Sequence, residues 1–76
     1  MAGKLPELRR REALALIEAF ATDIEHHGDL VVGSGRNGSF TIHLEHGRGL
    51  RPDQLSRALK YMGVSRDEFD AWRRSS

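Results

Sequence analysis

The stretch from Leu50 to Trp72 constrains the fold more than any other, because it predicts two helices joined by a tight corner. Pro52 suits the first turn of a helix, where its missing N–H leaves no hydrogen bond unmade. Gly63 is expected to end this helix, since glycine readily adopts the left-handed conformation found after a helix C-terminus. Between them, apolar side chains recur at the spacing of one helical face, at Leu55, Ala58, Leu59 and Met62.

A second helix is predicted to begin just after Ser65. Ser65 and Glu68 form an S-x-x-E capping box, in which each side chain accepts a hydrogen bond from the other residue's backbone N–H. Val64 and Phe69 occupy the positions of a hydrophobic staple, and Trp72 continues the apolar face one turn later. Several local signals therefore agree on a helix–glycine–helix unit.

Length and composition limit the classes of protein that this chain can belong to. Its 76 residues suffice for one domain and include no cysteine, which excludes disulfides and thiolate metal sites. No apolar run approaches the roughly 20 residues of a membrane span, so we expect a cytoplasmic protein without membrane contact. Twelve basic residues against eleven acidic ones give a net charge of +1, which lacks the strongly basic character of an obvious nucleic-acid binder.

The N-terminal region predicts a helix that opens at Pro6 and Glu7. Its apolar side is formed at helical spacing by Leu14, Ile17, Phe20 or Ala21, and Ile24, with Leu16 beside them. Two ends are compatible with the pattern. The helix runs to about His27, before Gly28, or it stops near Ala21 and leaves Thr22 to Glu25 extended.

The middle of the chain predicts a β-hairpin. Leu30 to Val32 is a short β-prone run, and Phe40 to Glu45 alternates apolar and polar residues. Asn37-Gly38 is the preferred pair for a two-residue turn, which would place Ser39 opposite Arg36. In that register one face of the hairpin collects the side chains of Val31, Phe40, Ile42 and Leu44.

The opposite face of this hairpin carries more apolar surface than a two-layer domain can cover. Leu30, Val32 and His43 lie on it, and we expect them to form a protein interface. An isolated hairpin is rarely stable, so either Thr22 to Glu25 adds a third strand or another chain does, a second copy included. The sequence predicts one α+β domain over residues 1–76, with an N-terminal helix, an antiparallel hairpin or three-stranded meander, and a C-terminal helix–Gly–helix.

The segment from Thr41 to Phe69 resembles the HicA family, small RNA-cleaving toxins of toxin–antitoxin pairs. The resemblance implies a fold like that of double-stranded-RNA-binding domains, with the order α-β-β-β-α, and a HicB-like antitoxin as partner. It rests on a strand that ends at His46, a short glycine-containing loop, and then Leu50, Pro52, Leu55, Ala58-Leu59, Gly63-Val64-Ser65 and Asp67-Glu68-Phe69.

The chain departs from that family at the catalytic motif. HicA proteins carry their catalytic histidine in a Gly-Ser-His motif at the start of the strand before the hairpin turn. An ungapped extension back from His46 places Leu30 at that position, after Gly28 and Asp29. The resemblance therefore implies RNA or antitoxin binding, with ribonuclease activity that is at most degenerate.

Histidines are the candidate catalytic groups, because the pKa of histidine suits a general base near a ribose 2′-hydroxyl. We name His27 and His46 as the acid and base candidates of a metal-independent endoribonuclease. The alternative interpretation is a set of surface histidines without catalytic work. His43 and His46 point to opposite faces of a strand, so the sequence predicts no metal site and no cofactor.

Basic residues of the hairpin tip, the following loop and the next helix are the candidate RNA contacts. Double-stranded RNA is recognised mostly through phosphates and 2′-hydroxyls, which a strip of cations can bind. Solvated charges without a ligand are the alternative interpretation. The candidates are Arg36, Arg48, Arg51, Arg57 and Lys60.

Two other functions compete with RNA binding. The spacing of Leu59, Gly63 and Phe69 also fits a helix-turn-helix DNA binder, but its second helix would direct Asp67 and Glu68 at phosphates, which is unfavourable. A non-enzymatic protein-interaction module or inhibitor that uses the hairpin face needs no chemistry from the histidines.

Overall fold

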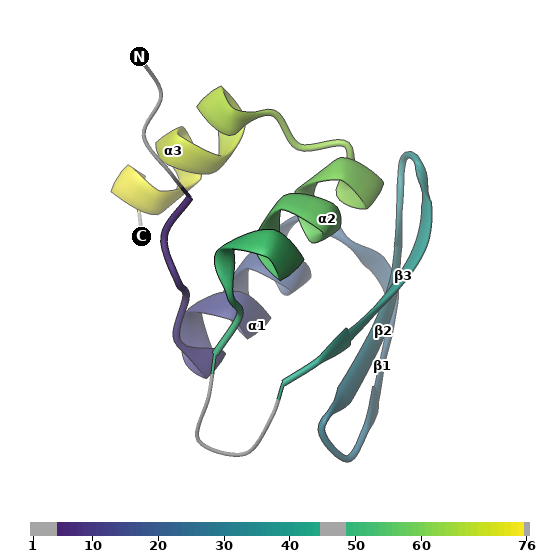
Figure 1. The fold of residues 1–76 in the computed structure, drawn as a ribbon. Coiled ribbons are helices and arrows are strands. Elements are labelled where there is room, and N and C mark those ends of the chain that lie inside the picture. Colours follow the sequence, from purple (N-terminus) through teal and green to yellow (C-terminus); the bar gives the residue numbers. More distant parts are fainter. Residues whose placement is uncertain (1–4, 45–48, 76) are drawn as a thin grey trace.

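The computed structural model describes residues 5–44 and 49–75, and in this part of the chain three helices lie on the same side of a three-stranded antiparallel sheet (Figure 1). The strands follow the order β1-β2-β3, which confirms the α+β class and the three-stranded meander. No helix among these residues has the length and apolarity needed to span a bilayer. The elements are α1 (Arg10–Phe20), β1 (Thr22–His27), β2 (Leu30–Gly35), β3 (Gly38–His43), α2 (Pro52–Met62) and α3 (Arg66–Ser75).

Helix α1 begins four residues later than the sequence predicts. The predicted start at Pro6 and Glu7 is wrong, because Leu8 pairs with Leu50 in a short antiparallel bridge. The Leu8 N–H donates to the Leu50 carbonyl at 2.9 Å, and the Leu50 N–H donates back at 2.7 Å. Both leucine side chains are fully buried. The backbone before α1 is therefore held by a contact with a segment more than forty residues away, which local propensity does not reveal.

Helix α1 ends at Phe20, so the earlier of the two predicted ends is the observed one. The chain then turns extended at Ala21, and β1 pairs with β2 from Thr22 onward. An extra residue between Thr22 and Glu25 forms a β-bulge, and Asp23 within it has a φ of 50°. Such bulges bend a strand and increase its twist, and here one follows directly after the helix.

The predicted turn between β2 and β3 is wrong by one residue. The pairing of Gly35 with Gly38 makes Arg36 and Asn37 the two turn residues, instead of Asn37-Gly38. This moves the register by two residues, which keeps every side chain on its predicted face. Val31 is accordingly paired with Ile42, and Phe40, Ile42 and Leu44 are buried as expected.

The core lies between the inner sheet face and the helices. Helix α2 rests on β3 and β2 with Leu55, Ala58, Leu59 and Met62 buried, as the sequence predicts. Helix α3 lies on the side of the helical layer away from the sheet (Figure 1). It is fixed there by the fully buried Phe69 and by Trp72, whose ring centroid lies 6.5 Å from that of Phe20 in α1 and 6.3 Å from that of Phe69 in the same helix.

The corner between α2 and α3 has the predicted geometry. Gly63 is left-handed, with φ 71° and ψ 31°, a conformation that costs most other residues about 1 kcal/mol or more. The Ser65 N–H donates to Glu68 Oε1 at 3.1 Å, and the Glu68 N–H donates to Ser65 Oγ at 3.1 Å. The capping box predicted from the sequence is thus present.

Candidate functional site

The tip of the β2–β3 hairpin is clamped to the C-terminal end of α2. The Asn37 N–H donates to the Tyr61 carbonyl at 3.0 Å, and Asn37 Nδ2 donates to the Lys60 carbonyl at 2.8 Å. Gly35 lies so close to α2 that a Cβ added to it would be 2.9 Å from Met62 N and nearer still to Met62 Cα. The hairpin tip and the helix end therefore form one unit.

This clamp places Arg36 beside the end of α2. Its aliphatic stem passes over Gly63, where an added Cβ would lie 3.0 Å from Arg36 Cβ and Cδ. Lys60 is adjacent, because its carbonyl accepts the Asn37 bond, and Arg57 follows one helical turn away. Arg51 is the N-cap residue of α2, about 9 Å from Arg57 along the helix axis.

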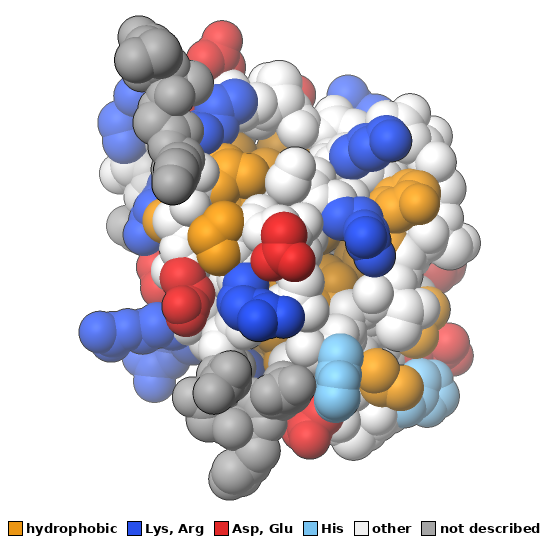
Figure 2. Space-filling model, in the orientation of Figure 1, with side chains coloured by type: hydrophobic (Ala, Val, Ile, Leu, Met, Phe, Trp, Pro, Cys, Tyr) orange, Lys and Arg blue, Asp and Glu red, His pale blue; other side chains and the backbone are white. Residues whose placement is uncertain are grey.

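We call Arg36, Arg51, Arg57 and Lys60 the basic strip; all four are exposed. Figure 2 shows blue side chains along α2 on the face turned to the viewer, with a red carboxylate among them. Within the described residues the strip forms no ion pair, whereas other arginines do. Those pairs are Arg10–Asp29 at 3.5 Å, Arg66–Asp70 at 3.1 Å and Arg73–Glu12 at 3.8 Å. The strip thus presents cations that form no ion pair with a described carboxylate, Asp53 on α2 included.

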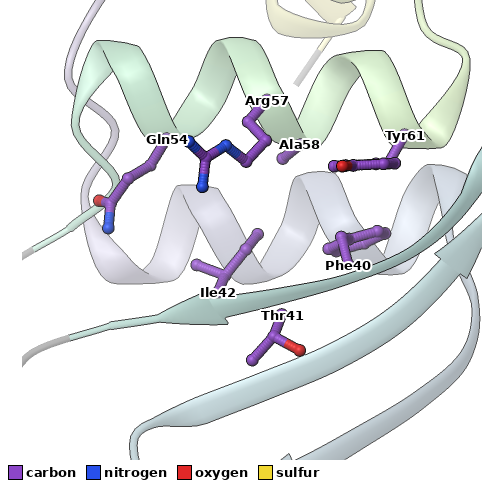
Figure 3. A pocket seen from close by; sticks show the side chains of 7 residues that line it. All are labelled: Phe40, Thr41, Ile42, Gln54, Arg57, Ala58 and Tyr61. Atoms are coloured by element: carbon purple, nitrogen blue, oxygen red, sulfur yellow. The ribbon is translucent and has the colours of Figure 1, made fainter.

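A groove of about 240 Å³ lies between β3 and α2. Phe40 and Ile42 point from β3 toward the helix, and Thr41 points the other way (Figure 3). The remaining lining comes from α2: Gln54, Arg57, Ala58 and Tyr61. Sequence reasoning missed this groove. The only signal was that these four α2 residues recur at i, i+3, i+4 and i+7, and this spacing marks one helix face without showing what it faces.

In the described part of the chain, no helix or loop covers the sheet face opposite the helices, which we call the outer face (Figure 1). The register aligns His27, Leu30 and His43 in one row across the three strands. Leu30 is 40% exposed and Val32 is half-buried. The structure therefore brings the predicted protein-interface residues Leu30, Val32 and His43 together on one surface.

Among the described residues, the predicted catalytic residue His27 does not lie near the predicted RNA-binding residues of the basic strip. His27 is exposed on the outer face, with its Nε2 3.7 Å from Glu25 Oε2, and the sheet separates it from the basic strip. His46 and Arg48 lie outside the described residues. The described residues hold no cluster of three or more His, Cys, Asp or Glu side chains suited to a metal ion.

No protein-family model, curated protein or solved structure matches this chain. One side of the molecule offers cations beside a groove, and the outer face offers an exposed leucine between two imidazoles. These surfaces are suited to binding an anionic polymer and a protein, respectively.

Proposed function

We propose that the protein binds double-stranded RNA through the basic strip. The observation that carries this proposal is the clamp of the hairpin tip on α2, which fixes Arg36 beside Lys60 and Arg57 while the strip remains free of ion pairs among the described residues. Cations held on a rigid surface can match a row of phosphates without first breaking internal salt bridges. Duplex RNA is recognised in this manner, by shape and backbone contacts.

RNA is favoured over DNA by the character of α3. A helix-turn-helix protein would insert α3 into the major groove, yet the first turn of α3 carries Asp67 and Glu68. Its Arg66 is already paired with Asp70 at 3.1 Å. Carboxylates directed at phosphates oppose binding, whereas the basic strip has only Asp53 among its cations on α2.

The order α1-β1-β2-β3-α2 is the one that the resemblance to the HicA family implies, and α3 follows it as a further helix. A HicB-like antitoxin is the partner that the resemblance implies. We propose binding without efficient cleavage. His27 lies on the outer face, so it cannot reach a 2′-hydroxyl of an RNA held on the basic strip. A general base must come within hydrogen-bonding distance of the proton it removes.

The test measures affinity by fluorescence anisotropy for an RNA duplex of about 20 base pairs and for the DNA duplex of the same sequence, between about 50 and 200 mM salt. Log affinity should fall linearly with log salt, and Arg36→Ala or Lys60→Ala should each reduce the slope by about one. Arg74→Ala, an exposed change at the end of α3, is the matched control and should leave the slope unchanged. An RNA affinity that is undetectable at low salt would overturn the proposal.

The exposed Leu30 favours a second candidate function, protein interaction through the outer face. A partner that covers the row of Leu30 and its flanking histidines would remove apolar surface from water. Leu30→Asp should then abolish association with a copurifying partner or with a second copy, measured by sedimentation velocity, while the helical circular dichroism signal is retained. Ser34→Asp, on the same strand and face but in the polar row of Thr22, Ser34 and Ser39, is the matched control.

A further inference from the structure

The outward edge of β3 has unused hydrogen-bonding groups. β3 is the last strand of the sheet, and its two-residue turn makes Gly35 and Gly38 a hydrogen-bonded pair. Alternation then directs the backbone of Phe40 and Ile42 to β2, and that of Ser39, Thr41 and His43 outward. Within residues 5–44 and 49–75, no backbone hydrogen bond from a strand, turn or loop reaches these outward groups.

The groove between β3 and α2 opens along this same edge. In an added strand, alternate side chains would point to the helical layer, as Ile42 does in β3 (Figure 3). The groove would receive one apolar side chain against Ile42, Ala58 and Tyr61. Edge pairing of this kind takes its affinity from backbone hydrogen bonds and its specificity from pockets for alternate side chains.

The positive charge at the groove favours an acidic side chain in the added strand, beside the apolar one. Arg57 lines the groove and forms no ion pair with a described residue, and no carboxylate is among the lining residues. Arg36 and Lys60 stand nearby at the clamped hairpin tip. An acidic side chain two positions from the apolar one would lie on the same side of the added strand and meet this positive rim.

A second copy of this chain fits the edge less well. Antiparallel pairing of two β3 strands about a twofold axis at Thr41 would place the Arg57 of each copy on the same side of the joint sheet. Like charges brought together in this manner disfavour association, whereas a peptide with carboxylates is complementary.

We propose that β3 accepts an extended acidic peptide as a fourth strand, with an apolar side chain in the groove and a carboxylate against Arg57. The proposal is independent of RNA binding. It depends on the backbone edge at Thr41 and on the groove, which the RNA proposal does not use. The two proposals share the cations of the rim, Arg57 and the nearby Arg36 and Lys60.

The probe is the peptide acetyl-Thr-Glu-Thr-Leu-Thr-Glu-Thr-amide, added to the nitrogen-15-labelled full chain. Amide hydrogen exchange should slow at Thr41 and its edge neighbours Ser39 and His43, by about 100-fold at a peptide concentration about 100 times Kd. The amides of Phe40 and Ile42 should change little, because β2 already holds them. If no peptide-dependent protection appears at Thr41, the proposal is overturned.

Two comparisons separate strand addition from other modes of binding. The same peptide N-methylated on its third and fifth residues lacks the N–H groups that would face β3, and it should not bind. If it binds equally well, the groove takes side chains without strand pairing and the proposal fails. Thr41 protection that rises with protein concentration in the absence of peptide would identify a second copy as the occupant, which also overturns it.

The charge requirement has its own pair of variants. Arg57→Glu should weaken the Glu peptide at least about tenfold and favour the matching Lys peptide, since it reverses the charge at the rim. Arg51→Glu makes the same charge change on the same helix outside the groove, and it should have little effect on either peptide. Equal loss in both variants would show only a general charge effect and would contradict the assigned role of Arg57.

Discussion

The two hairpin turns of the sheet have equal length but are held in different ways. The β1–β2 turn consists of Gly28 and Asp29; Gly28 has a φ of 64°, and a Cβ added to it would meet no atom within 4 Å. The β2–β3 turn consists of Arg36 and Asn37, is bonded to two carbonyls of α2 and is flanked by a glycine in contact with Met62. Outside its own hairpin the first turn is held by the partly exposed pair of Asp29 with Arg10 at 3.5 Å and by the Leu44 N–H, which donates to the Asp29 carbonyl at 2.8 Å. Its shape is therefore determined mainly by local backbone chemistry, whereas that of the second turn is determined by packing on a helix.

The largest expected effect is at Gly35. Gly35→Ala would force its Cβ against the backbone of Met62, which cannot move without shifting α2. We expect a loss of about 3 kcal/mol in the free energy of unfolding, measured by urea denaturation. A loss below about 1 kcal/mol would show that the hairpin tip can separate from α2 at little cost, and the distinction between the two turns would fail.

Asn37 tests the hydrogen-bonded part of the same contact. Asn37→Ala removes the bond from Nδ2 to the Lys60 carbonyl but leaves the backbone N–H bonded to Tyr61. We expect a loss of about 1.5 kcal/mol in the free energy of unfolding. Asn37→Asp is the matched control of similar shape. It offers no donor to the carbonyl, so it should be no more stable than the alanine variant.

Gly28 provides the corresponding test at the open turn. Gly28→Ala meets no steric obstacle, so only the positive φ opposes it, at about 1 kcal/mol. Gly28→Asn should cost less in the same urea experiment, because asparagine tolerates this conformation better than alanine. If alanine at Gly28 were as harmful as alanine at Gly35, the first turn would also depend on packing.

The same distinction explains how much of the fold could be predicted from the sequence. The α2–Gly63–α3 corner was predictable because its helix start, left-handed glycine and capping box each act within a few residues. The start of α1 was not, since the pairing of Leu8 with Leu50 joins distant segments. The prediction of the β2–β3 turn residues was wrong for the same reason. Asn37-Gly38 is a strong local signal, but the bonds from Asn37 to α2 determine which residues turn.

Some parts of the candidate surfaces could likewise be predicted from the sequence, and others depend on how distant segments pack. Arg57 and Lys60 could be placed on one helix from spacing, and Leu30, Val32 and His43 on one sheet face from alternation. The proximity of Arg36 to Lys60 could not be predicted from the sequence, because it depends on the packing of the hairpin tip against α2. The groove and the free edge of β3 likewise require the position of α2 relative to the sheet.

The smallest expected effect concerns Arg36, the residue that the clamped turn presents. Arg36→Ala removes the aliphatic stem over Gly63 but no ion pair among the described residues, so we expect a loss of about 0.5 kcal/mol or less in the free energy of unfolding. Exchange of the Asn37 amide hydrogen should stay slow, because its bond to Tyr61 remains.

Asp29→Ala is the matched change at the open turn, where only the 3.5 Å pair with Arg10 is lost, and its cost should be similarly small. A loss above about 2 kcal/mol in the free energy of unfolding for Arg36→Ala would show that the Arg36 side chain stabilises the turn and is not merely exposed on it. The weakened RNA binding expected of the same variant would then reflect a disordered hairpin tip and not a missing charge.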